Sequence, residues 1–210
     1  QSRKVYTRHG VKGDMFGVSF AELKSLKKKI RVDHELAQAL WETGNHDARM
    51  LACMIADPKQ SDRELLESWV NDINNYILGD QFSGLAASSG FGHSCMDDWT
   101  MDSREFVAQV GWNVVALFAI KRTDLEDLFF GPWLNIAARE IHDRPNRVRH
   151  AMNQAVIAIG CRSEALKARA LEAAAVIGRV TVDHGETGCK TPDIVPYIEK
   201  TWKRKAAREK

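Results

Sequence analysis

Apolar residues recur along most of this chain at intervals of three and four, which places them on one face of an α-helix. The first stripe of this kind consists of Phe20, Leu23, Leu26 and Ile30. A second stripe follows Asn45, whose side chain is suited to cap a helix, and stops at Asp57-Pro58. Both stripes predict amphipathic helices that bury one side and expose the other.

The stretch of residues 67–82 continues this pattern, because apolar residues recur at intervals of four from Trp69 to Ile77. We expect the helix to break at Gly79 and to leave Asp80 at the start of the next segment. A carboxylate at such a break is either a functional group or a residue that caps the following helix.

The second half of the chain gives further helix signals. The run VGWNVVALFAI is apolar on nearly all sides, so it predicts a central buried helix. Residues 123–126, TDLE, form a capping-box pattern that opens a segment in which Pro132 is expected to cause a kink or break. Pro145 suits the first turn of a helix that ends at Gly160.

These elements predict an all-α fold. Only residues 176–183, VIGRVTVD, compete as a strand. Helix pairs of about 35–45 residues, joined by short turns, favour a helical solenoid, with a compact bundle as the alternative. We expect an N-terminal arm over residues 1–15, a helical domain over residues 16–202 and a basic tail over residues 203–210.

Composition is typical of a globular domain, with 44% hydrophobic and 28% charged residues among 210. No apolar run reaches the roughly 18 residues of a membrane span, and the first residues lack the apolar core of a signal peptide. We therefore expect a cytoplasmic protein with no membrane partner. The four Cys residues are far apart, which favours free thiols over a disulfide framework.

Charge is unevenly distributed. The net charge of the whole chain is +2, whereas the last eight residues, KRKAAREK, alone carry +4, so residues 1–202 carry −2. Nucleic-acid binding would therefore require a local basic face. One candidate is the start of the helix after Pro145, which gathers Arg144, Arg147, Arg149 and His150. These cations could meet phosphate oxygens, or they could form a solvated helix start that Asp143 partly neutralises.

Residues 184–191, HGETGCKT, suggest two other kinds of site. A phosphate-binding loop needs four residues between its glycines and a Lys directly after the second, and this segment has neither. His184 and Cys189, with His93 and Cys95, are suitable zinc ligands, but neither pair has the spacing of a zinc motif. We expect no metal and an ordered loop that leads into a last helix at Pro192.

Three consecutive runs carry a family resemblance: FGVSFAELKSLKKKI, DHELAQALWETGNHDARMLACMIADP and WVNDINNYILGDQF. They resemble the short bacterial DNA alkylation repair proteins related to the AlkD-type alkylpurine DNA glycosylases. The resemblance covers residues 16 to about 177, and HDARMLACMIADP is its most specific part.

The resemblance implies a superhelical stack of HEAT-like helical repeats, an ARM-repeat-like solenoid, whose groove binds double-stranded DNA. Active relatives hydrolyse the N-glycosidic bond of N3- or N7-alkylated purines without a metal or organic cofactor. In those relatives an Asp lies near the sugar, an Arg contacts the backbone, and Trp side chains contact the deoxyribose backbone.

Carried over residue by residue, the match is partial. Asp80 falls on the family's Asp and is the candidate catalytic residue. Tyr76 falls where active members have Trp, Gln109 falls on or beside the Arg position, and Gln154 falls where another Trp is expected. A nearby carboxylate can stabilise the oxocarbenium-like sugar that forms as a cationic purine leaves. Gln, in contrast, cannot make a charge-assisted contact with phosphate.

Three functions are compatible with these residues. The first is a DNA glycosylase that uses Asp80. The second is a catalytically silent relative that binds distorted or branched DNA. The third is a helical-repeat scaffold for protein partners, which an apolar, uncharged groove would favour.

Overall fold

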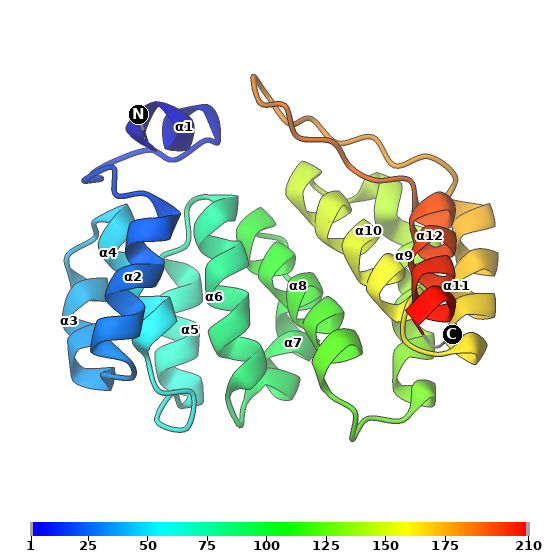
Figure 1. The fold of residues 1–210 in the computed structure, drawn as a ribbon, viewed down its shortest axis with the longest axis horizontal. Coiled ribbons are helices and arrows are strands. Elements are labelled where there is room, and N and C mark those ends of the chain that lie inside the picture. Colours follow the sequence, from blue (N-terminus) through cyan, green and yellow to red (C-terminus); the bar gives the residue numbers. More distant parts are fainter. Residues whose placement is uncertain (1, 209–210) are drawn as a thin grey trace. The chain divides into compact units, whose positions relative to one another are not determined.

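A computed structural model describes residues 2–208 (Figure 1). Its helices, with two short 3₁₀ turns, are α1 (Ser2–Arg8), α2 (Phe20–Ile30), α3 (His34–Glu42), α4 (His46–Ile55), α5 (Arg63–Asn71), α6 (Tyr76–Ser88), α7 (Gly92–Thr100), α8 (Glu105–Lys121), η1 (Asp127–Phe130), α9 (Gly131–Glu140), η2 (Ile141–Asp143), α10 (Asn146–Gly160), α11 (Glu164–Ile177) and α12 (Ile194–Arg208).

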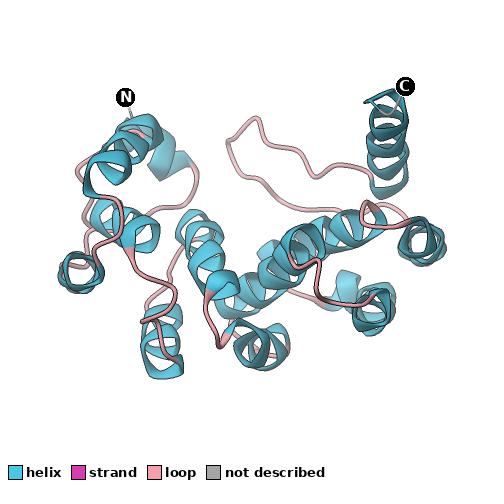
Figure 2. Ribbon diagram, turned by 60° about the horizontal axis from the view of Figure 1, so that its bottom comes forward, coloured by secondary structure: helices cyan, strands magenta, loops and turns pink. Residues whose placement is uncertain are grey.

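The predicted all-α fold is confirmed. Residues 2–208 contain no strand (Figure 2), and the alternating pattern at residues 176–183 does not form one. Residues 178–193 run instead as irregular chain and turns between α11 and α12. Within the described part of the chain, no helix is long and apolar enough to cross a membrane.

The contacts divide the chain into two compact units. The first unit comprises the chain up to Gly111 together with His184–Gly188. The second comprises Trp112–Asp183 and the chain from Cys189 onward. The division falls inside α8, so it does not coincide with a loop. The domain boundaries expected near residues 15 and 202 stay predictions.

Aromatic side chains form the core of the first unit. Trp41 of α3 and Trp69 of α5 stack with their ring centroids 4.2 Å apart and an interplanar angle of 1°. Phe82 of α6 packs against both rings and against Trp99 of α7. All four side chains are buried, and aromatic residues bury much apolar area. This packing fixes the position of α6, the helix that carries Asp80.

The break expected at Gly79 is wrong. Helix α5 ends at Asn71, and α6 begins four residues before Asp80, so Gly79 lies inside a helix. The actual break is set by side chains: Asn75 caps α6 by accepting a hydrogen bond from the backbone of Leu78 at 3.0 Å. Upstream, the Asp72 carboxylate accepts hydrogen bonds from Trp41 and Arg49 of other helices, which holds the turn in place.

The first part of the segment expected as an N-terminal arm forms a docked helix, α1. Tyr6 of α1 is buried and donates a hydrogen bond to the backbone oxygen of Val18 at 2.7 Å. The buried carboxylate of Asp47 accepts backbone N–H groups of Phe16, Gly17 and Val18 at 2.6, 3.0 and 2.9 Å. Contacts from α4 therefore hold the chain between α1 and α2.

Two local predictions in the second unit are wrong. Pro132 neither kinks nor breaks a helix, because it occupies the first turn of α9, where proline is tolerated. Residues 123–126 do not start a helix either. Asp124 instead pairs with the preceding Arg122, and Arg162 binds the backbone oxygens of Arg122 and Leu125. These long-range contacts hold the segment as a turn.

Helices α10, α11 and α12 pack closely at Gly160. A Cβ atom at this position would lie 2.5 Å from Cδ1 of Ile198 and 2.8 Å from Cβ of Ala170. The indole of Trp202 donates to the Gly160 oxygen at 2.9 Å, which holds α12 on α10. Helix α12 continues through most of the predicted basic tail, as far as Arg208, while residues 209–210 lie outside the described residues.

Candidate functional site

Asp80 lies in the second turn of α6 with its side chain exposed. Gly79, its neighbour, is buried and faces Gln109 and Val110 of α8. A Cβ atom at Gly79 would lie 3.4 Å from Nε2 of Gln109. The glycine therefore allows the Gln109 side chain to approach α6 closely and does not end the preceding helix.

Gln109 connects the first turn of α6 to Asp80. Its Nε2 group donates to Oδ1 of Asp80 at 2.8 Å and to the backbone oxygen of Tyr76 at 3.1 Å. The residue is only 3% exposed, and its Oε1 atom is buried without a hydrogen-bond partner within residues 2–208. A neutral amide thus orients the carboxylate of Asp80 at the position where the resemblance implies an arginine.

Tyr76 lies near Asp80, as its four-residue spacing on the helix requires. Its phenol forms a hydrogen bond with Nδ1 of His9, and the ring centroids are 5.9 Å apart with an interplanar angle of 52°. His9 directly follows α1. No local pattern indicates a role for His9, because the two partners are 67 residues apart in the sequence.

The basic residues at the start of α10 are half-buried. Arg144 lies 3.7 Å from the carboxylate of Glu140, which partly neutralises it. The Nε atom of Arg149 is buried without a hydrogen-bond partner within the described chain. Nδ1 of His150 lies 3.1 Å from the hydroxyl of Thr191, and Arg147 is half-buried beside them.

Gln154 is half-buried, two turns beyond Arg147 on α10. The adjacent Asn153 donates to the backbone oxygen of Pro192 at 3.0 Å. Asn146 exchanges two hydrogen bonds of 2.7 Å with the backbone of Asp183. One face of α10 is therefore bound to the irregular chain before α12, a contact that the sequence did not reveal.

The predicted site residues fall into two groups. Asp80, Tyr76 and Gln109 meet through hydrogen bonds in the first unit. The second group, on and next to α10 in the second unit, consists of Arg144, Arg147, Arg149, His150 and Gln154.

Three polar residues of the motif HDARMLACMIADP have structural roles: His46, Asp47 and Arg49. His46 is buried against the edge of Tyr6, with the ring centroids 5.0 Å apart. Asp47 holds the chain before α2, and Arg49 binds Asp72 at 2.8 Å before α6. The motif therefore positions the elements around Asp80 and does not itself supply a reactive group.

Comparisons with known proteins identify two similar sequences and one similar structure. Two Listeria proteins, uncharacterized protein Lin0241 of L. innocua and uncharacterized protein Lmo0209 of L. monocytogenes, are each 28% identical over 212 residues. Each alignment covers 96% of this chain and 90% of the relative.

One solved structure matches with a TM-score of 0.88 and 26% identity, over 97% of this chain and 88% of the other. It is described as a new family of proteins related to the HEAT-like repeat DNA glycosylases with affinity for branched DNA structures. This match confirms the predicted HEAT-like helical repeats. The model of one family, described as DNA alkylation repair enzyme, matches residues 1–207. The chain therefore belongs to the DNA alkylation repair enzyme family.

Proposed function

We propose that this protein binds DNA, prefers branched structures to plain duplex, and does not hydrolyse alkylated purines efficiently. The family match over residues 1–207 supports action on DNA. The similar structure with affinity for branched DNA supports the preference, because that similarity extends over 97% of this chain.

The contact between Gln109 and Asp80 carries the catalytic part of the proposal. Loss of a cationic purine leaves positive charge on the sugar, and an exposed carboxylate such as Asp80 can stabilise it. An efficient site must also position the DNA backbone, for which a cation is well suited. Here a buried neutral amide occupies the space beside the carboxylate, 2.8 Å away. Tyr76 also directs its hydroxyl to His9.

A DNA glycosylase is the second candidate. The observation in its favour is that the Asp80 carboxylate is exposed and one of its oxygens is oriented by Gln109. An already cationic leaving base needs no general acid, so a single positioned carboxylate is the minimum that this reaction requires.

The binding experiment compares labelled four-way junctions, forks and duplexes of equal length. We expect tighter binding of the branched molecules, with affinity that falls steeply as salt rises, because phosphate contacts dominate such binding. Equal affinity for junction and duplex would contradict the preference. No binding at low salt would contradict the proposed function as a whole.

The catalytic experiment measures release of N7-methylguanine and N3-methyladenine from duplex DNA at low salt. Wild type should release little base, and Gln109→Arg should release more, because a charge-assisted contact is worth about 1.5–3 kcal/mol. Gln109→Leu, which supplies no donor, is the control of similar size. Efficient release by wild type that Asp80→Asn abolishes would establish the glycosylase instead.

A further inference from the structure

Positive charge is concentrated in the N-terminal segment, and the proposed function gives these cations no role so far. Residues 1–14 contain four basic residues and one acidic residue, a net charge of +3, whereas the whole chain carries +2. Since the last eight residues carry +4, residues 15–202 carry −5. The two ends of the chain therefore carry an excess of positive charge that can attract a polyanion such as DNA.

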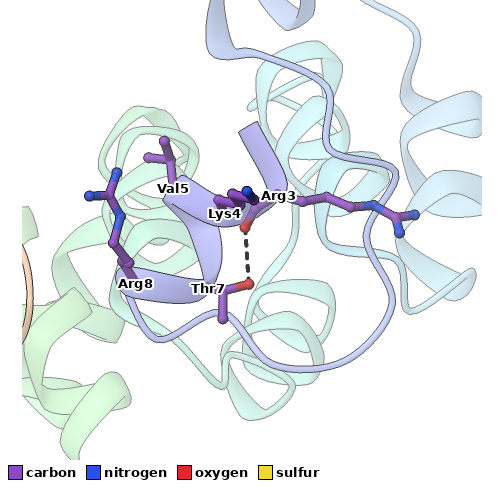
Figure 3. Close-up of a pocket in the computed structure, with 5 residues that line it drawn as sticks. All are labelled: Arg3, Lys4, Val5, Thr7 and Arg8. Carbon is purple, nitrogen blue, oxygen red and sulfur yellow. Dashed lines mark hydrogen bonds between the residues drawn. The ribbon is translucent and has the colours of Figure 1, made fainter. Parts of the chain in front are cut away.

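Helix α1 displays these cations around a hollow. An open surface depression of about 620 Å³ is lined by Arg3, Lys4, Val5, Thr7 and Arg8 (Figure 3). Arg3 and Arg8 extend in opposite directions from the helix, and the Thr7 hydroxyl donates to the backbone oxygen of Arg3 at 3.0 Å. All five residues are exposed.

The charges of these cations are not neutralised by the protein. Within residues 2–208, Arg3, Lys4 and Arg8 form no ion pair with a carboxylate. Arg3 donates through Nε to the backbone oxygen of Phe16 at 3.3 Å, which orients its guanidinium and does not cancel its charge. The guanidinium nitrogens of Arg suit bidentate recognition of phosphate.

Helix α1 is also held in a defined position. An isolated helix of seven residues is unstable in water, so its docking must supply the order. Tyr6 and Val11 are buried, and a Cβ atom at Gly17 would lie 2.6 Å from Cγ of Arg3. The His9–Tyr76 hydrogen bond attaches the end of the helix to the first turn of α6. The cations are thus presented from a docked helix next to the elements that carry Asp80.

We propose that Arg3, Lys4 and Arg8 form a binding site for the phosphodiester backbone of DNA, beside the α6 site. This inference rests on the proposed function, which supplies DNA as the ligand. The site positions the strand near Asp80 and reads no base sequence, because phosphate contacts carry no sequence information.

The test replaces Arg3, Lys4 and Arg8 with Gln and measures junction binding over a range of salt. The matched control replaces Lys27, Lys28 and Lys29 of α2, which are equally exposed, with Gln. We expect the first triple variant to bind at least ten-fold more weakly and to lose about 2–3 in the slope of log affinity against log salt. The control should change much less.

Several results would overturn the inference. Equal losses in the two triple variants would show a general effect of charge, and no loss in the α1 variant would exclude the site while leaving the proposed function intact. Inorganic phosphate that competes better than chloride at equal ionic strength would indicate a small-anion site. Absence of junction binding by wild type would overturn the proposed function, and this inference with it.

A cross-linking measurement is independent of affinity. Val5 is 36% exposed and lies between the cations, so a photoreactive amino acid placed there should leave docking through Tyr6 intact. We expect cross-links to the junction, and fewer from the same group at Val32, which is 61% exposed. No cross-link from position 5 while the protein is saturated with junction would contradict the proposed site.

Discussion

At the scale of single residues, the burial of the Asp47 carboxylate is a feature that the pattern of apolar and polar positions does not predict. Its carboxylate is 2% exposed, although a charged group is costly to bury unless it is hydrogen-bonded. Three backbone N–H groups meet that requirement, at residues 16–18. Asp47 therefore connects α4 to the chain between α1 and α2.

Asp47→Asn should lower the free energy of unfolding by about 2–3 kcal/mol, because an amide has only one acceptor oxygen and places a donor against backbone N–H groups. Urea denaturation measures the change. Glu172→Gln, at an exposed position of α11, is the control and should alter stability little. A loss in Asp47→Asn no larger than in this control would contradict the assigned role.

His46 should make the stability depend on pH. Burial lowers the pKa of His46, and the nearby carboxylate of Asp47 opposes this shift only in part. A His in the unfolded chain titrates at about pH 6.5, so as the pH falls the unfolded chain takes up this proton at a higher pH than the folded protein does. The free energy of unfolding should therefore be highest above about pH 6.5 and fall as the pH decreases.

Urea denaturation at several values between about pH 7.5 and 5.5 measures this dependence, in a range where carboxylates contribute little. His46→Gln should flatten the curve, since Gln does not titrate. An unchanged slope in this variant would show that another group is responsible.

At the scale of elements, close approach between helices depends on particular glycines. Gly160→Ala should lower the free energy of unfolding by about 1–3 kcal/mol, because Cβ of Ala170 cannot rotate away and the helices must separate. Gly84→Ala in α6 is the control, since nothing lies within 4 Å of a Cβ atom there. That change should stabilise the protein by about 0.5–1 kcal/mol. Urea denaturation of both variants makes the comparison, and equal effects would contradict the packing argument.

The sequence predicts elements well where local signals decide them. Asn45 caps α4 and the helix after Pro145 reaches Gly160, both as the pattern indicated. The break before Asp80 was misplaced because the apolar spacing of Trp69, Ile73 and Ile77 continues through it. The contact between His9 and Tyr76 and the contact between Gln109 and Asp80 depend on tertiary packing, so local patterns could not predict them.

At the scale of the whole molecule, substitutions in the second group of predicted site residues measure how much the start of α10 contributes to DNA binding. Arg147→Ala with Arg149→Ala should weaken junction binding and reduce the salt slope by about 2, since each phosphate contact contributes roughly 0.9. Arg139→Ala with Arg179→Ala removes the same charge at exposed positions and is the control. Salt-dependent binding measures both, and equal slopes for the two variants would exclude a specific role for the start of α10.

Because the positive charge is concentrated at the two ends, loss of either end by proteolysis would reverse the sign of the net charge. Loss of residues 1–14 would change the net charge from +2 to −1, and loss of residues 203–210 would change it to −2. A clipped molecule would therefore migrate in the opposite direction on a native gel near neutral pH. Preparations that have lost one terminus would be separable by ion exchange from the intact protein, although their masses differ little.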